Sequence, residues 1–536
     1  MIFDGAWRLL QGQVPYRDVL YPFGPVTFVV QALFFMVFGV NFSATVLSAA
    51  VLNAVAGLLV MRIVYRLLPD ARAIAFLAGI ATICWFQAPF GTLWFEQTAF
   101  FFGLVALFVA LEAEFLVGSR VYWLHACAGV LMVVSVLSKQ NAGVLFIPAV
   151  AGVAVVPHLH PRALRTALLR LAAQLSGFSI ASAAFFAWLW LFSEPRQFFH
   201  YSIEITRRLA DQRTPVNPTV FITGFFTFGA YPLSLKLSAL FLALIGLGAL
   251  LAGVLRWPQS PEQSKTYALA GWITLSCLVF QELFIFATVN EAENGLPFIG
   301  LASGLSLGIL AGVLGREGAR WSLSSGTKHL HAVVSGRACR ALLIAILVLV
   351  WVPMILQGAR VSWKRFVQEY TSQSRFGGML DVDGLRRVKW ADFSYADRLE
   401  LVEPGHSTSA GEWWLRKSDF EGVNNWLAQH RGNFFVFGDA TMLYGLHHSI
   451  SPQPWLYFLA DHSYLREDVA GVDEIVTASL SRKSIRTVII EKVSWAGGQD
   501  AEWLTHMPRL KAWIEDNFVK EKEYGIYEVW VAKQQS

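Results

Sequence analysis

The sequence predicts a polytopic α-helical membrane protein with a soluble α/β domain at its C-terminal end. Of its 536 residues, 55% are apolar and only 15% are charged, whereas soluble domains carry about 25% charged residues. The apolar residues form long blocks up to about Ile355, and beyond it polar and charged residues return at an ordinary soluble density. The first part of the chain therefore lacks the polar surface that water requires.

The apolar blocks predict about ten transmembrane helices, because a helix needs about 20 apolar residues to cross a bilayer. An eleventh block, 23–39, begins with prolines, and its pattern alone leaves open whether it spans the membrane or lies in the interface. We therefore divide the chain into an external segment 1–41, a membrane domain 42–357 and a C-terminal domain 358–536. The expected spans are 42–66, 73–90, 95–116, 121–138, 142–157, 171–192, 234–255, 267–288, 296–314 and 341–357.

The basic residues of the short loops predict the orientation in the membrane, because loops rich in Lys and Arg stay in the cytoplasm. The turn at Lys139, the 193–218 loop and the C-terminal domain then lie outside, which in a bacterial inner membrane means the periplasm or exterior. The net charge of +5 is small, and its loop placement argues against nucleic acid as a partner. The cytoplasmic set is Arg62, Arg66, Arg72, Arg120, Arg162, Arg165, Arg170, Arg256, Lys265, Arg316, Arg320, Lys328, Arg337 and Arg340.

Helical and strand patterns alternate in the C-terminal domain, which predicts a small α/β fold. Asp439 follows the first expected strand, where it either binds a ligand or caps the next helix. The expected elements are a helix from Ser418 to His430, a strand at Phe434–Phe437, a strand at Thr487–Ile490, a helix over 501–518 and a strand at Tyr524–Val531.

Charged residues at the outer ends of spans are the candidate site, because charges near a bilayer are costly and mark function. Glu96, Lys139 and Gln140 belong to this set, and Asp4, Arg8, Arg17 and Asp18 join it if the N-terminus is outside. Cations that hold a phosphate and a carboxylate that accepts a proton suit group transfer from a phosphate carrier. Glu96 at a helix start and Lys139 reaching headgroups are the structural alternatives. Arg207 and Arg208 suit anionic lipid as well as substrate.

The cytoplasmic histidines do not predict a metal site, because the sequence shows no carboxylate pattern to match them. These residues are His125, His158, His160, His329 and His331. No phosphate-binding loop of the GxxxxGK[ST] type occurs, which argues against direct use of ATP. We expect no firm cofactor, and a divalent metal stays possible.

The N-terminal string Asp4 to Asp18 resembles the first external loop of the GT-C glycosyltransferases. The resemblance is to the branch of protein O-mannosyltransferases and bacterial lipid-A or lipopolysaccharide sugar transferases. That loop has an Asp and then A-x-x-L-x-x-G-x-x-P-Y-x-D, and the same order runs from Ala6 to Asp18 here. The Pro-rich Tyr21–Pro25 and the Phe38-Gly39 end extend the match over about forty residues. Weaker similarities lie at Phe95-Glu96-Gln97 and Leu137-Ser138-Lys139-Gln140.

The resemblance implies that 23–39 is a juxtamembrane helix and that residues 1–21 lie outside. It also implies an inverting transfer of a sugar from a polyprenyl-phosphate carrier to a lipid, glycan or protein acceptor. Asp4 is then the general base, and Asp18 and Glu96 position donor or acceptor. Lys139, with Gln140 beside it, and Arg17 meet the carrier phosphate. Membrane lipid is a further expected partner.

One departure from that family leaves alternatives open. Its members carry a transmembrane helix before this loop, which we call the aspartate loop (residues 4–25 here), and three residues precede Asp4 in this sequence. The start is assigned too far downstream, or the chain is truncated, or the protein lacks that helix. The alternative functions are a transport protein for a lipid-linked glycan and a non-catalytic membrane protein with the same fold.

Overall fold

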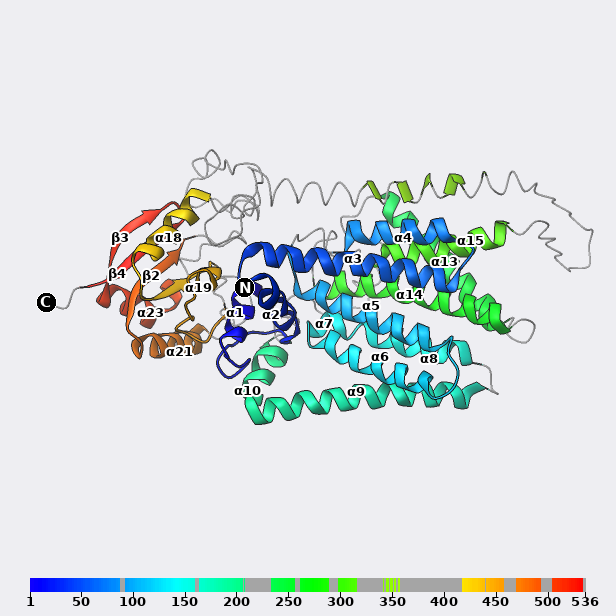
Figure 1. Cartoon of the computed structure of the whole chain (residues 1–536), viewed down its shortest axis with the longest axis horizontal. Coiled ribbons are helices and arrows are strands. Elements are labelled where there is room, and N and C mark those ends of the chain that lie inside the picture. Colours follow the sequence, from blue (N-terminus) through cyan, green and yellow to red (C-terminus); the bar gives the residue numbers. More distant parts are fainter. Residues whose placement is uncertain are drawn as a thin grey trace, which may run out of the picture.

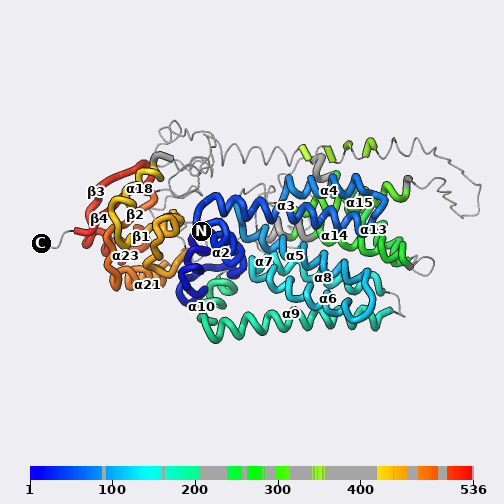
Figure 2. The backbone as a smooth tube through the Cα atoms, in the orientation of Figure 1, coloured from blue at the N-terminus to red at the C-terminus, as the bar shows by residue number. Residues whose placement is uncertain are grey.

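The computed structural model is an elongated helical bundle with a sheet domain at one end (Figure 1). The N-terminal helices α1 and α2 lie between the bundle and the sheet domain, as the backbone trace also shows (Figure 2). The structure describes residues 1–86, 92–159, 163–205, 207, 233–255, 261–288, 297–315, 341, 344–346, 348–349, 351–352, 355–356, 417–438, 440–456, 469–492 and 504–533.

The bundle consists of helices that run along the long axis of the molecule (Figure 1). Short elements, α7 (Gln140–Gly143) and η1 (Val156–His158), extend α8 at its two ends. The main helices are α3 (Phe42–Leu67), α4 (Arg72–Trp85), α5 (Phe95–Ala113), α6 (Arg120–Val136), α8 (Phe146–Val155), α9 (Leu164–Phe192), α13 (Leu233–Leu255), α14 (Pro261–Thr288) and α15 (Ile299–Gly315).

Membrane-protein character is confirmed at the level of apolar helices. Within the described residues, five helical stretches are long and apolar enough to cross a membrane. This is half of the ten spans predicted. The predicted spans at 73–90, 121–138 and 296–314 form shorter helices, and α4 with its 14 residues extends only about 21 Å. The span at 267–288 lies within α14, which is not one of the five stretches, and much of 341–357 lies outside the described residues. The five stretches are Phe42–Leu67, Phe95–Ala113, Gln140–His158, Leu164–Phe192 and Ser238–Leu255.

Helices α6 and α9 approach one another closely because each carries a glycine at the contact. A Cβ atom at Gly129 would lie 2.0 Å from the carbonyl oxygen of Gln174. One at Gly177 would lie 1.9 Å from the carbonyl oxygen of Ala126. Small residues that admit a neighbouring backbone are the usual basis of helix packing in membranes, where burial of apolar surface gives little driving force.

The helix α2 (Val26–Phe38) covers most of the block whose role the sequence pattern left open. Its 13 residues extend about 20 Å, less than the roughly 30 Å of hydrocarbon in a bilayer. Its exposed face is apolar, formed by Val29, Leu33, Met36 and Val37. At this length the helix is too short to span a bilayer by itself.

A buried carboxylate joins several helices at the end of α5. The two oxygens of Glu114 lie 3.2 Å from His125 Nε2 and 3.1 Å from His158 Nε2. Arg170 from α9 and Lys265 from α14 pair with the same carboxylate. The expectation that these histidines lack a carboxylate partner is therefore wrong, because Glu114 is distant in sequence and comes to them only through helix packing.

The C-terminal domain is a four-stranded sheet in the order β1-β2-β4-β3. The strands β1 and β2 are parallel, and the β2–β4 and β3–β4 pairs are antiparallel. Its strands are β1 (Asn433–Phe437), β2 (Ile485–Glu491), β3 (Phe518–Tyr524) and β4 (Tyr527–Ala532). Its helices are α18 (Lys417–Gln429), α19 (Met442–Leu446), α21 (Val469–Ser481), η6 (Leu504–His506) and α23 (Pro508–Asn517).

The small α/β fold is confirmed, but helix α21 and strand β3 were not expected. The expected last strand, Tyr524–Val531, is the second arm of a hairpin whose first arm, β3, was not expected. Gly525 makes the turn with a φ of +54°, a backbone conformation that favours glycine. Strand β3 was not predicted because most of its side chains are charged and exposed, so its residues lack the apolar pattern of a buried strand. Asp439 lies outside the described residues.

We predict that Glu114→Gln destabilises the helical bundle by about 3–5 kcal/mol, because it leaves Arg170 and Lys265 near a neutral buried amide. Thermal unfolding of the detergent-solubilised protein measures this loss. Glu112→Gln is the matched control, because its carboxylate is partly exposed, at 24%, and pairs with Arg62 and Arg66 only at 3.9 and 3.5 Å. We expect such a long, partly solvated pair to contribute about 1 kcal/mol or less. Equal losses in the two variants would contradict a special role of Glu114.

Candidate functional site

Asp4 and Arg8 form a buried ion pair on α1 (Ile2–Leu10). They are four residues apart and therefore share one face of the helix. Arg8 Nε lies 2.8 Å from Asp4 Oδ2, and neither side chain has exposed surface. The sequence placed both residues outside the membrane, but only the fold shows that they contact each other in a buried position.

Arg8 also binds the C-terminal domain. Its Nη1 donates to the carbonyl oxygens of Gln453 and Pro454 at 3.1 and 3.4 Å, and its Nη2 to that of Trp455 at 3.0 Å. Three carbonyls and a carboxylate thus surround one planar guanidinium group, which is the geometry that arginine satisfies best. The segment 453–455 consequently covers the Asp4–Arg8 pair.

The second oxygen of Asp4, Oδ1, is buried and has no hydrogen-bond partner among the described residues. Burial raises the pKa of the Asp4 carboxyl above its ordinary value, although Arg8 and the N-terminal ammonium group act in the opposite direction. An unsatisfied buried carboxylate oxygen with a raised pKa is typical of a group that exchanges a proton.

The turn after α1 brings Arg17 and Asp18 together. Asp18 Oδ2 accepts a hydrogen bond from the Val14 amide and pairs with Arg17 Nη2, both at 2.8 Å. Burial alone would raise the pKa of Asp18, but the hydrogen bonds from Arg17 and Val14 outweigh it, and the pKa lies below its ordinary value. Arg17 Nη1 also donates to the Phe192 carbonyl at 3.3 Å. Asp18 therefore holds the turn in its shape and keeps Arg17 at the end of α9.

Tyr16 sits at the centre of this turn with a φ of +63°, a conformation that is uncommon for a residue with a side chain. Its hydroxyl donates to the carbonyl of Phe23, and its amide donates to that of Val19 at 2.7 Å. The ring is fully buried, 5.0 Å from the ring of Tyr21. The proline-tyrosine part of the motif thus fixes the path of the chain between α1 and α2.

Glu96 and Lys139 form a second ion pair. Glu96 is in the first turn of α5, and Lys139 precedes α7. The Lys139 ammonium group lies 5.6 Å from the centre of the Phe23 ring, and Gln140 Nε2 lies 3.5 Å from the Pro22 carbonyl. Glu96 Oε2 is buried and unpartnered within the described part of the chain. The predicted site residues of α5 and α7 therefore meet at the Pro-rich segment.

The Pro-rich segment is packed directly on the end of α6. A Cβ atom on Gly24 would lie 1.8 Å from the carbonyl oxygen of Leu137, so no other residue fits without moving the backbone. The amide of Val26 donates to the same carbonyl at 3.2 Å. This contact places the loop that follows Asp18 next to the Lys139 turn.

The structure therefore brings the predicted site residues into three ion pairs: Asp4–Arg8, Arg17–Asp18 and Glu96–Lys139. In the described chain no hydrogen bond joins one pair to another, and a single loop, residues 11–25, connects them. The sequence argument did not give Arg8 a role, and its position four residues after Asp4 was the available signal. Nothing in the sequence pointed to the 453–455 segment, because it lies about 450 positions away.

A search of the described residues finds no group of three or more His, Cys, Asp or Glu side chains arranged to hold a metal ion. The carboxylate of Glu114, which does meet two histidines, is occupied by Arg170 and Lys265 as well. The site described above consequently rests on carboxylates, cations and backbone carbonyls.

Neither the protein-family models nor the curated proteins include a match to this chain. The resemblance of residues 4–39 to the GT-C glycosyltransferases therefore rests on the residues themselves, and the activity that it implies is a proposal.

Proposed function

We propose that this protein is a membrane glycosyltransferase that moves a sugar, with inversion, from a polyprenyl-phosphate carrier to an acceptor at the outer face of the cytoplasmic membrane. The observation that carries the proposal is the buried, partly unsatisfied carboxylate of Asp4 within the aspartate loop motif. The ion pair Glu96–Lys139 lies beside the same loop and supplies a further charge pair at that end of the bundle.

The proposal includes about ten transmembrane helices, with α1, α2 and the sheet domain outside. Support comes from the two ends of the bundle. The Arg66, Arg170 and Lys265 side chains gather around Glu112 and Glu114 at the end predicted to be cytoplasmic. The aspartate loop lies at the opposite end, beside the sheet domain (Figure 1).

In the proposed reaction an acceptor hydroxyl gives its proton to Asp4 as its oxygen attacks the anomeric carbon. The bond from that carbon to the phosphate oxygen breaks, and the lipid phosphate leaves with the electron pair. A carboxylate serves as base only when it is ionised and within hydrogen-bond reach of the hydroxyl. Arg8 holds the carboxylate in place. In this proposal Lys139 and Arg17, which pair here with Glu96 and Asp18, turn to the leaving phosphate.

Access to Asp4 requires the C-terminal domain to shift. Its carboxylate has no exposed surface, because the 453–455 segment lies over the Asp4–Arg8 pair. An acceptor reaches it only after the carbonyl contacts of Arg8 open. The state seen here is therefore, in this proposal, the closed state of the enzyme.

The same burial favours one alternative, in which Asp4 only neutralises Arg8 and the pair serves to dock the C-terminal domain. The fold would then support a non-catalytic or transport role for a lipid-linked glycan. The three backbone carbonyls that accept hydrogen bonds from Arg8 favour this docking role.

We predict that Asp4→Asn lowers sugar transfer by about 10²–10⁴-fold, because it removes the general base. Labelled polyprenyl-phosphate sugars and purified protein in detergent measure the transfer, with thermal unfolding measured in parallel. Asp70→Asn, an exposed change in the α3–α4 turn, is the control for the chemistry of the substitution.

The double variant Asp4→Asn with Arg8→Gln separates the two roles. It leaves two neutral amides and so removes the uncompensated buried charge that either single change creates. A transferase recovers its folding but stays inactive, since no carboxylate is present. Recovery of both folding and transfer would mean that Asp4 is only a docking residue.

We also predict a characteristic pH dependence. The raised pKa of Asp4 keeps its carboxyl protonated to a higher pH than that of an ordinary aspartate, whose pKa is about 3.9. The rate of transfer therefore rises with pH as Asp4 ionises, and this rising limb of the pH profile lies above the ordinary aspartate pKa. Arg8→Gln removes the cation that lowers this pKa and moves the limb to higher pH. The pH profile of kcat/KM reports the free enzyme, and a limb that stays in place or moves down would count against Asp4 as the base.

A further inference from the structure

A short helical segment follows α9 at its outer end. It begins as α10 (Pro195–Phe198) and continues as the π-helix η3 (Phe199–Ile205). A π-helix is rare because its wider turn packs less well, and such turns are frequent at functional sites. The segment is therefore a candidate binding site.

One face of this segment is locked into the protein. Phe198, Tyr201, Ser202 and Ile205 are buried. The Phe198 ring lies 5.1 Å from the ring of Tyr16, and the Tyr201 ring lies 4.8 Å from that of Trp455. The segment is consequently held by the aspartate loop and by the C-terminal domain at once.

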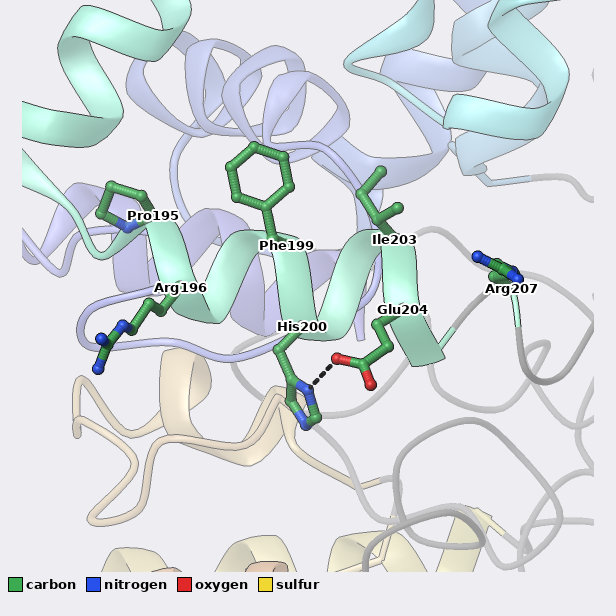
Figure 3. Close-up of a pocket in the computed structure, with 7 residues that line it drawn as sticks. All are labelled: Pro195, Arg196, Phe199, His200, Ile203, Glu204 and Arg207. Carbon is green, nitrogen blue, oxygen red and sulfur yellow. Dashed lines mark hydrogen bonds and ion pairs between the residues drawn. The ribbon is translucent and has the colours of Figure 1, made fainter.

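The opposite face lines a cavity of about 640 Å³ (Figure 3), a size within the range of small-molecule sites. Figure 3 shows Phe199 and Ile203 projecting to one side of the helix, and Arg196, His200 and Glu204 to the other. The lining residues are Pro195, Arg196, Phe199, His200, Ile203, Glu204 and Arg207. A ligand with both apolar and charged groups would meet apolar side chains on one side of the segment and charged ones on the other.

The charges of the cavity favour an anion with a single charge. The lining carries two guanidinium groups, Arg196 and Arg207, at opposite ends of the segment (Figure 3), and one carboxylate, Glu204, which lies 3.1 Å from Nδ1 of His200. In the described part of the chain Arg196 has no carboxylate partner. The surplus of one positive charge matches a phosphodiester, whereas a doubly charged phosphate monoester would meet more repulsion from Glu204.

The cavity also lies at the expected boundary between hydrocarbon and water. Only 11% of the most apolar window of α9 is buried in the protein, so this helix is the one most open to lipid among the five candidate spans. Its last residues, Trp190, Leu191 and Phe192, are exposed, and aromatic residues gather at that boundary. Phe199 stacks on Phe186 of α9 with ring centroids 6.0 Å apart, which continues the apolar surface to the cavity.

We propose that this cavity binds an anionic phospholipid of the outer leaflet. Arg196 and His200, which project to the same side of the segment, bind the phosphodiester, and Phe199 and Ile203 contact the first carbons of the chains. Arginine is suited to this role because its planar group donates two parallel hydrogen bonds to phosphate oxygens. The site goes beyond sugar transfer, since it would anchor the external segment to the bilayer whatever the reaction is.

Native mass spectrometry of the full chain in detergent tests the site with phosphatidylglycerol as the probe and phosphatidylcholine as the zwitterionic comparison. We expect preferential retention of phosphatidylglycerol and about tenfold weaker retention in Arg196→Gln, which corresponds to about 1.4 kcal/mol. Arg482→Gln, an exposed arginine of the sheet domain, should leave retention unchanged. His200→Gln gives a second variant, and thermal unfolding verifies that each variant is folded.

Three results would overturn the proposal. The first is equal retention of the two phospholipids by the unaltered protein. The second is equal retention of phosphatidylglycerol by the Arg196, His200 and Arg482 variants. The third is an Arg196 dependence seen with polyprenyl phosphate or inorganic phosphate but not with phosphatidylglycerol, because the cavity would then serve the donor or a free anion. Loss of transfer in Asp4 variants has no bearing on any of them.

Discussion

The buried guanidinium group of Arg8 is the interaction on which the external part of this protein depends. It holds the Asp4 carboxylate on its own helix and three carbonyls of residues 453–455 in the C-terminal domain. A cation without exposed surface is tolerable only when its donors are satisfied, so the domain, the loop and the helix constrain one another. Trp7, which donates to the Ser449 carbonyl at 2.6 Å, strengthens the same junction.

The aspartate loop acts as the connector between otherwise separate elements. Its backbone pairs with the C-terminal domain through Leu20 and Trp455, and its Pro-rich end is packed on α6 through Gly24. Its Arg17 reaches the end of α9, and Tyr16 contacts the segment that carries the lipid cavity. A displacement of the C-terminal domain would therefore be felt at the proposed base, at the Glu96–Lys139 pair and at the cavity together.

Charged side chains gather at the two ends of the helical bundle, and they have different roles there. The Glu114 carboxylate pairs with two histidines, an arginine and a lysine. Such a cluster stabilises helix packing in a membrane, where apolar side chains contact lipid as favourably as they contact other helices. At the other end the carboxylates Asp4 and Glu96 each keep one oxygen without a partner among the described residues. Leaving a buried carboxylate oxygen without a partner is costly, and both of these carboxylates lie in or beside the loop that carries the proposed chemistry.

The sequence by itself determined the class of this protein, because hydropathy and the period of apolar residues are local properties. It also predicted three of the four strands of the C-terminal domain, and it singled out Asp4, Glu96 and Lys139 as candidate site residues because they are charges at the ends of apolar blocks. It missed strand β3, whose exposed charged residues lack an apolar pattern. Only the tertiary structure joined Arg8 to residues 453–455, Glu114 to His125 and His158, and Lys139 to Glu96. Those pairings depend on which helices pack side by side, and no local pattern records that choice.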